Sequence, residues 1–230
     1  MLRLNQLEIT QGTFRLLADL SIPAGEKIAV IGASGGGKST LLALIAGFIA
    51  PKSGQLIWQD NDITDLPPAK RPISMIFQDN NLFPHLTAAQ NVGLGISPAL
   101  RLTQEDHTKI TSALDRVGLA DMATRKPAAL SGGQIARVAL ARLLVQGNTL
   151  VLLDEPFAAL GPAMRAEMLD LVSELVSEIG ATLLMVSHAP EDAKRIADQV
   201  VLVSDGIAHV PKRTKDLFEN PPTAMREWIG

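Results

Sequence analysis

The stretch G-A-S-G-G-G-K-S-T, Gly32 to Thr40, decides the fold of this 230-residue chain. It follows the apolar run K-I-A-V-I and precedes the apolar run L-L-A-L-I-A, which read as a buried strand and a helix. The order matches the pattern G-x-x-x-x-G-K-[ST] in the strand and helix context that this pattern requires. A glycine-rich turn with no role beyond joining the two elements is the alternative, and both flanking runs argue against it.

This glycine-rich loop predicts a phosphate-binding site. Glycines let backbone N–H groups point inward around phosphate oxygens, and the start of the following helix adds its positive end. We expect Lys38 to reach the β- and γ-phosphates of a nucleotide, and the Ser39 hydroxyl to bind Mg²⁺. The predicted nucleotide-binding residues of the loop are Gly32, Ala33, Ser34, Gly35, Gly36, Gly37, Lys38, Ser39 and Thr40.

A pair of acidic residues follows a second apolar run, T-L-V-L-L at 149–153. Acids at the end of a buried parallel strand lie beside such a loop. We expect Asp154 to hold Mg²⁺ through water, and Glu155 to act as the general base for an attacking water. The alternative is a simple turn after a strand. The presence of the glycine loop in the same chain favours the metal and base roles over that alternative.

Two more polar residues stand at predicted strand ends. His188 follows A-T-L-L-M-V-S and is expected to touch the γ-phosphate, and Gln78 follows I-S-M-I-F and is expected to sense Mg²⁺ and the water. Each would be an ordinary turn residue if it stood alone. The other three histidines, His85, His107 and His209, lack such neighbours and are read as surface or turn residues.

Composition limits the class of protein. Hydrophobic residues make up 47% of the chain and charged residues 20%, which is typical of a folded globular protein. A net charge of -3 without a basic stripe argues against a nucleic-acid partner. The absence of cysteine excludes disulfides. The apolar run Leu41 to Ala50 is far shorter than the roughly 20 residues that span a bilayer, so a membrane role requires a partner.

The remaining patterns predict an α/β fold. Strands are expected within 2–31, at 56–58, 73–77, 149–154 and 181–187, and in a hairpin at 199–210. All-apolar strands separated by helices indicate a parallel sheet that is buried on both faces. Helices are expected at 38–47, 162–179 and 190–197, and over 86–146 with breaks at Gly118, Pro127 and Gly132.

The stretch L-S-G-G-Q, Leu130 to Gln134, begins the last helix of that block. Ser131 is a good N-cap residue, yet Gly132 and Gly133 in the first turn each cost roughly 1 kcal/mol relative to alanine. A backbone stripped of side chains at a helix N-terminus can approach a phosphate closely.

With the glycine loop, Gln78, the acidic pair and His188, this stretch resembles the motif set of ABC ATPases, in order along nearly the whole chain. The resemblance implies a P-loop NTPase (RecA-like) parallel-sheet core with an N-terminal antiparallel β subdomain. It places the core at 1–78 and 147–230, and an inserted helical subdomain at 79–146. It further implies ATP and Mg²⁺ as ligands, and a head-to-tail homodimer. There Ser131, Gly132, Gly133 and Gln134 cap the γ-phosphate held by the opposite subunit.

Three features depart from the family pattern. Ile135-Ala136-Arg137 replaces a more basic and polar segment, and Gly161 ends A-A-L-G where the family usually has S-A-L-D. The aromatic residue that stacks on adenine is often tyrosine, which this chain lacks; Phe14 is the nearest candidate, although Gln11 lies closer to the expected place.

A single short ATPase unit resembles the motor subunit of a bacterial importer. Arg71 to Val92 resembles the importer branch that serves anions, polyamines, iron and thiamine. Within that branch, Q-D-N-N-L-F at 78–83, Q-N-V-G-L-G-I-S-P-A-L at 90–100, the brief C-terminus and T-L-L-M-V-S-H are most similar to the ATP-binding subunits of thiamine importers. The implied partners are an integral-membrane permease and a periplasmic solute-binding protein, with this chain peripheral on the cytoplasmic face of the inner membrane. Leu82 and Phe83 either receive a permease helix or pack inside the helical subdomain.

Three other functions remain open at this point. The same motor can serve another solute, such as a polyamine, iron or an anion, or an exporter of lipoprotein type. The departures at Ile135 and Gly161 would suit a nucleotide-dependent dimer switch with little turnover. A P-loop kinase would need an acceptor-substrate site and would not need Leu130 to Gln134.

Overall fold

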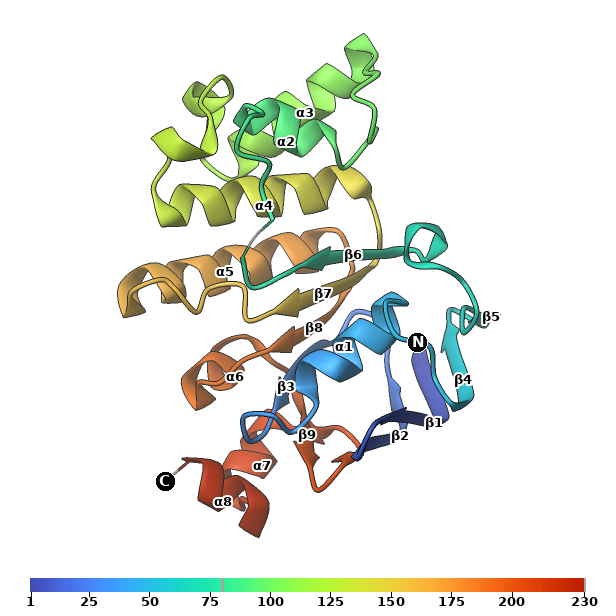
Figure 1. Ribbon diagram of the computed structural model, residues 1–230. Coiled ribbons are helices and arrows are strands. Elements are labelled where there is room, and N and C mark those ends of the chain that lie inside the picture. The colour runs from blue at the N-terminus through green and yellow to red at the C-terminus, as the bar shows by residue number, and fades with distance from the viewer. Residues whose placement is uncertain (80, 230) are drawn as a thin grey trace.

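The computed structural model describes residues 1–79 and 81–229, with the side chains of 227–229 left aside. Within these residues eleven strands form one continuous sheet (Figure 1). The strand order is β5-β4-β1-β2-β10-β9-β3-β8-β7-β6, and β11 pairs with β9. Half of this sheet is antiparallel and half is parallel, as the sequence predicts.

The parallel half contains the apolar strands of the sequence. Its members are β3 (Lys27–Ile31), β6 (Ile73–Ile76), β7 (Leu150–Asp154), β8 (Thr182–Val186) and β9 (Gln199–Ser204). Almost every residue of β3, β7 and β8 is buried, because helices cover both faces of this half.

The antiparallel half is built from the N-terminal strands β1 (Leu2–Gln11), β2 (Phe14–Ile22), β4 (Ser53–Trp58) and β5 (Asn61–Asp62). The short strand β10 (Ile207–Ala208) joins the two halves, since it is antiparallel to β9 and parallel to β2. The hairpin expected at 199–210 is therefore present, and it connects the two halves of the sheet. The edge strand β11 is Lys212–Arg213.

Side chains that alternate along the parallel strands enter different apolar clusters. Leu152 of β7 packs in the cluster that contains α1 (Lys38–Ala46), whereas its neighbour Val151 packs in the cluster that contains α5 (Pro162–Glu178). On the α5 side, α6 (Pro190–Ile196) continues the cover. This alternation is the period of two that a strand dictates.

A layer of helices lies above α5 in Figure 1 and comprises α2 (Ala88–Gly93), α3 (Gln104–Arg116) and α4 (Gly132–Gln146). Thr87 and Thr103 begin α2 and α3 with capping boxes. The expected breaks are confirmed: α3 has ended before Gly118, a 3₁₀ turn begins at Pro127, and α4 begins at Gly132. Residues 94–103 are not helical, so the predicted helical block is less continuous than its pattern suggests.

The sequence reading misses several short elements, among them a 3₁₀ turn at Pro68–Lys70, α7 (Thr214–Glu219) and α8 (Thr223–Ile229). Helices of six or seven residues carry too few apolar positions to show a period, and tertiary contacts stabilise them. Leu217 and Met225 anchor α7 and α8 against Val200 and Leu202 of β9. In the described part of the chain, every helix is too short or too polar to cross a membrane.

Candidate functional site

Four of the predicted site segments leave the parallel sheet at the same edge. Gly32 follows β3, Gln78 comes two residues after β6, Glu155 follows β7, and His188 comes two residues after β8. The register pairs Val30 with Val186, and Val186 with Asp154. The carboxyl ends of these strands are therefore level, which brings the segments together.

The glycine loop is shaped by positions that only glycine accommodates. Gly32 has a φ of 145°, and a Cβ there would lie 2.1 Å from the Val203 carbonyl oxygen of β9. Gly37, the N-cap of α1, has a φ of 103° and no side-chain cap. The loop thus has backbone conformations and contacts that exclude a side chain at both ends.

Lys38 is the first residue of α1, and its side chain folds back onto this loop. The residue is only 4% exposed. Its Nζ donates hydrogen bonds to the carbonyl oxygens of Gly32 and Ala33, at 2.9 and 2.8 Å. Burial lowers the pKa of Lys38, and the nearby charges of Glu155 and Asp154 act in the opposite direction. The loop therefore holds a buried ammonium group close to two carboxylates, suited to an anionic ligand with its counterion.

Ser39 and Asp154 come together as predicted. The Ser39 hydroxyl donates a hydrogen bond of 2.9 Å to Asp154 Oδ1. Burial raises the pKa of Asp154, the charge of Glu155 adds to this, and the Ser39 hydrogen bond, Lys38 and His188 oppose it. A hydroxyl and a carboxylate side by side supply the hard oxygen donors that Mg²⁺ prefers.

Glu155 and His188 also meet. His188 Nε2 lies 2.5 Å from Glu155 Oε1, although His188 is exposed on its other side. Glu155 has a φ of 48°, an uncommon conformation for a residue with a side chain, and its N–H donates to the Val186 carbonyl at 3.2 Å. Both residues line a cavity of about 210 Å³. A carboxylate and an imidazole in contact form a pair suited to moving a proton.

Gln78 is at the same sheet edge but is not drawn into this cluster. It lies in an exposed turn, and within residues 1–79 and 81–229 its side chain has no hydrogen-bond partner. His85, His107 and His209 are exposed, as expected; His85 meets the ring of Phe83 edge-on.

The aromatic candidate Phe14 packs against the glycine loop. A Cβ added to Gly37 would lie 2.7 Å from Cζ of the Phe14 ring. The ring is half-buried at the start of β2. Phe14 is therefore adjacent to the loop, where its ring could stack on a base. Gln11 lies exposed at the end of β1.

The L-S-G-G-Q stretch starts α4 away from the glycine loop. Ser131 and Gln134 form a capping box, in which each side chain bonds the other's backbone N–H. Gly132 is exposed, whereas Gly133 is buried beneath Met164, whose sulfur would lie 2.9 Å from an added Cβ. Among the described residues, this helix N-terminus has no hydrogen bond to the glycine loop of its own chain.

Two of the departures from the family pattern, at Gly161 and at Ile135-Ala136-Arg137, can be located in the structure. Gly161 is the N-cap of α5 with an ordinary φ of -65° and no side-chain cap, and a Cβ there would meet nothing within 4 Å. Arg137 donates to the Val117 carbonyl at 2.7 Å and pairs with Glu167 of α5. The basic residue retained in I-A-R thus ties the helical layer to α5.

Sequence reasoning overlooked Arg71, which is 6% exposed. Its guanidinium donates to the carbonyls of Leu44 and Ile45 at the end of α1, and to those of Thr64 and Leu66, at 2.7 to 2.8 Å. Burial lowers the pKa of Arg71. A charged residue just before an apolar strand is the available hint, but Leu44 and Ile45, its carbonyl partners on α1, are 27 and 26 residues away in sequence.

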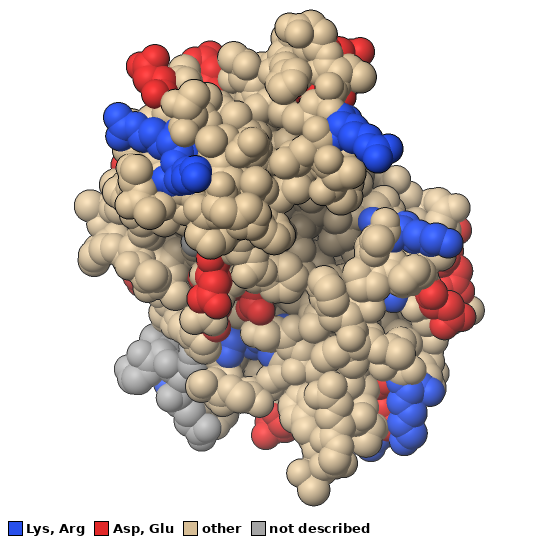
Figure 2. Space-filling view, turned by 45° about the horizontal axis from the view of Figure 1, so that its top comes forward, with Lys and Arg blue, Asp and Glu red and all other residues tan. Residues whose placement is uncertain are grey.

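Charges on the surface are dispersed. On the face drawn in Figure 2, Lys and Arg form several separate small patches, with Asp and Glu among them. No continuous band of positive charge crosses that face.

Comparisons with known proteins agree with this arrangement. Residues 17–158 match the family model described as ABC transporter. The chain is 58% identical to the thiamine import ATP-binding protein ThiQ of Cereibacter sphaeroides and 55% identical to that of Ruegeria sp., in both cases over 100% of each protein. It also resembles an ATP-binding cassette solved as a dimer in a post-hydrolysis state with ADP and Pi. That match has a TM-score of 0.79 and 29% identity, and covers 93% of this chain and 99% of the other.

Proposed function

The chain belongs to the ABC transporter family, and we propose that it is the ATP-hydrolysing subunit of an importer that carries thiamine across the bacterial inner membrane. The observation that supports the ATPase is the convergence of the Gly32–Thr40 loop, Asp154, Glu155 and His188 at one sheet edge. The choice of thiamine is supported by relatives of that name at 58% and 55% identity over their whole length.

ATP binding is assigned to the glycine loop and Lys38. The backbone N–H groups of the loop and the start of α1 face the phosphates, and Lys38 exchanges its carbonyl partners, Gly32 and Ala33, for phosphate oxygens. Phe14 lies beside Gly37 and offers its ring to the adenine.

Ser39 and Asp154 are the residues that would hold Mg²⁺, Ser39 through its hydroxyl and Asp154 through water, with Gln78 as a third contact. When bound, the ion neutralises charge on the phosphate oxygens. Their oxygens are already 2.9 Å apart in the protein alone, so the donor set fits the ion. The raised pKa of Asp154 also fits, since an opposite charge would favour the ionised carboxylate that burial disfavours.

Hydrolysis is assigned to Glu155 and His188. Glu155 accepts a proton from the water that attacks the γ-phosphorus, and the bond between that phosphorus and the bridging oxygen to ADP breaks. His188 holds the Glu155 carboxylate at 2.5 Å and contacts the γ-phosphate. Gln78 reaches this centre from the exposed turn after β6, which requires its side chain to move inward.

The L-S-G-G-Q stretch is assigned to a second copy of the chain. In a head-to-tail homodimer, Ser131, Gly132, Gly133 and Gln134 would cover the γ-phosphate held by the opposite subunit. The exposed N-terminus of α4 and the side-chain-free surface at Gly132 support this role. The solved relative is itself described as dimeric.

We further propose that the chain works as a nucleotide-binding core, 1–78 and 147–230, with a helical subdomain at 79–146 that meets the permease. Phe83 supports the second part: the residue is 48% exposed, and the side chain of buried Asn91 accepts a hydrogen bond from its backbone N–H and donates one to its carbonyl. Leu82 instead packs against the apolar cluster. A periplasmic solute-binding protein would complete the complex, with this chain on the cytoplasmic face.

The test is uptake of labelled thiamine at low external concentration, in source cells that lack the gene and carry a restored copy. Wild type and Glu191→Gln, a matched control at an exposed glutamate, should restore uptake, and Glu155→Gln should not. If deletion leaves uptake intact, thiamine is the wrong solute. If Glu155→Gln restores uptake, the role assigned to Glu155 is wrong. A single ATP consumed per site by the isolated complex would instead indicate a dimer switch.

A further inference from the structure

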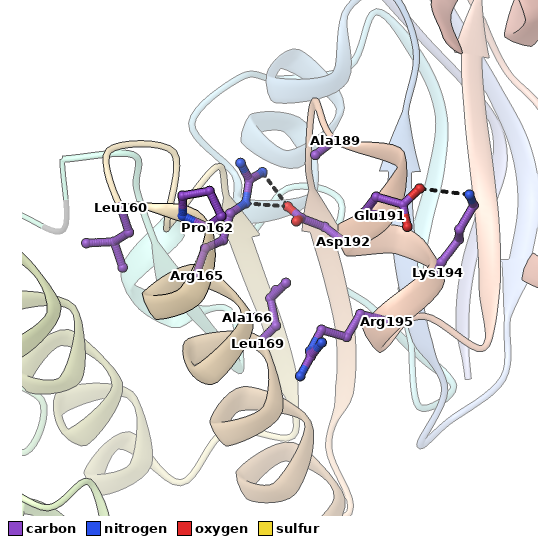
Figure 3. A pocket seen from close by; sticks show the side chains of 10 residues that line it. All are labelled: Leu160, Pro162, Arg165, Ala166, Leu169, Ala189, Glu191, Asp192, Lys194 and Arg195. Carbon is purple, nitrogen blue, oxygen red and sulfur yellow. Dashed lines mark hydrogen bonds and ion pairs between the residues drawn. The ribbon is translucent and has the colours of Figure 1, made fainter.

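A buried polar cluster lies directly behind the proposed catalytic pair. Arg165, in the first turn of α5, donates from Nε to Asp192 Oδ2 of α6 at 2.9 Å and pairs with the same oxygen through Nη2 (Figure 3). The same guanidinium donates to the Ser187 hydroxyl at 3.2 Å. Ser187 in turn donates to Asp192 Oδ2 at 2.6 Å, which closes a ring of three side chains.

The serine and the carboxylate of this cluster are shielded from water. Ser187 is 2% exposed and Asp192 is 7% exposed, while a quarter of the Arg165 side chain reaches solvent. A buried carboxylate that loses its counterion is left with a large desolvation penalty. The three groups therefore hold one another in a single arrangement.

The cluster touches the backbone on both sides of His188. The Ser187 hydroxyl accepts a hydrogen bond of 3.0 Å from the N–H of Ala189, so it spans the loop that presents His188. One residue earlier, the Val186 carbonyl accepts the N–H of Glu155. Arg165, Ser187 and Asp192 line the same 210 Å³ cavity as Glu155 and His188.

We propose that Arg165, Asp192 and Ser187 are positioning residues that set the His188 loop against the Glu155 turn. This inference rests on the proposed function, because it assumes that Glu155 and His188 act on the bound nucleotide. Arg165 stands four residues after Gly161, so the cluster also links the loop that follows Glu155 to the loop that carries His188. A displacement of about 1 Å at such a pair can cost on the order of 100-fold in rate.

A neighbouring ion pair allows a positioning role for Arg165 to be distinguished from a role that only holds α5 and α6 together. Arg195 of α6 donates to both carboxylate oxygens of Asp170 on α5, at 2.7 and 2.5 Å. It joins the same two helices as the Arg165 pair but is exposed and has no contact with Ser187. If α5 and α6 need only to be tied together, losing either arginine should have a similar effect on catalysis.

The experiment compares Arg165→Met with Arg195→Met in the complex isolated from source cells through a tag on this chain. We expect Arg165→Met to lower kcat about 10- to 100-fold with KM for ATP changed less than about threefold, and Arg195→Met to keep kcat within about twofold. Arg165→Lys should recover part of the loss, because it returns a positive charge to Asp192. Thermal unfolding of each variant ensures that folded protein is compared.

A second readout needs no nucleotide. The side-chain NMR resonances of His188, assigned by their loss in His188→Gln, should shift in full-length Arg165→Met and not in Arg195→Met. Equal effects of the two arginine variants, or unchanged kcat and resonances in Arg165→Met, would overturn the positioning role. Wild type and Glu155→Gln run in parallel: equal turnover in these two would show instead that the proposed catalytic site is wrong.

Discussion

Two glycine-rich helix N-termini in this molecule are built in opposite ways. The loop before α1 has Gly37 as N-cap with a φ of 103°, no side-chain cap, and Gly32 pressed against the Val203 carbonyl. The start of α4 has a serine N-cap with a full capping box, and its Gly132 would meet only Leu160, at 3.4 Å, if it gained a Cβ.

The difference shows where the need for glycine arises. In the first loop the chain itself excludes a side chain at Gly32, through the Val203 backbone, and at Gly37, through its φ and the Phe14 ring, so these two glycines are needed for the local structure. At α4 the local structure is conventional and the exposed Gly132 has ample room. The structure of this chain gives no steric need for glycine at 132, which leaves room for the proposed approach of a second subunit's nucleotide.

The largest effect expected from this comparison is a loss of folding stability in the Gly32→Ala variant. A Cβ 2.1 Å from a backbone oxygen, at a φ of 145°, should destabilise the fold by several kcal/mol, on the order of 3–5. Urea unfolding measures it. Gly35→Ala is the control, because Gly35 has a φ of 75° but open space around it, and it should cost only about 1–2 kcal/mol. Equal losses would show that the contact with Val203 has no importance.

The Gly132→Ala variant is expected to keep its folding stability but to lose ATP-dependent dimerisation and turnover. Its stability should be unchanged or higher by up to ~1 kcal/mol, since alanine is the better helix former. ATP-dependent dimerisation and turnover should both fall about tenfold or more, because the added methyl group would separate α4 from the opposite phosphate. Light scattering with ATP in a Glu155→Gln background measures the dimer. Unaltered dimerisation would mean that the space at Gly132 serves no partner.

The smallest effect concerns the carboxylate beside the first loop. Because burial raises the pKa of Asp154, its ionised form is less stable in the folded chain than in the unfolded chain. Asp154→Asn should therefore raise the Tm of nucleotide-free protein slightly at pH 7. This gain should vanish as the pH falls through the raised pKa toward that of an ordinary aspartate, where wild type is neutral too.

Asp170→Asn provides a control of opposite sign. Its hydrogen bonds to Arg195 lower the pKa of Asp170, so the ionised form stabilises the fold above the usual aspartate range. The substitution should lower the Tm at pH 7 and have less effect in acid. A lower Tm for Asp154→Asn at pH 7 would contradict the argument from burial.

Much of the parallel half could be predicted from the sequence, because its strands are apolar throughout and its glycine loop has a fixed pattern. Within this half, the observed register places Val30, Val186 and Asp154 at the same level, so that the predicted site segments leave the sheet side by side. The strand β10 could not be predicted as the joint between the two halves, since two residues carry no period and their partners lie far away in sequence.

The candidate site divides in the same way. Lys38, Ser39 and Asp154 were predictable because their roles follow from spacing next to recognisable elements. Arg165 and Asp192 were not, because an arginine and an aspartate on helices read as ordinary surface charges until α5 and α6 are packed together. For Leu82 and Phe83 the sequence leaves two readings open, contact with a permease helix or packing inside the helical subdomain, and only their burial distinguishes the two residues.

The carbonyl-bound Arg71 has an electrostatic consequence for the opposite end of α1. Aligned peptide dipoles give a helix about half a positive charge at its N-terminus and half a negative charge at its C-terminus. Arg71 places a full cation on the carbonyls of Leu44 and Ile45, and so more than offsets the negative end. The positive N-terminal end of α1, where we propose that the phosphates bind, then has little opposing field along the helix axis. Arg71, at the far end of α1, would thereby contribute to the attraction of anions.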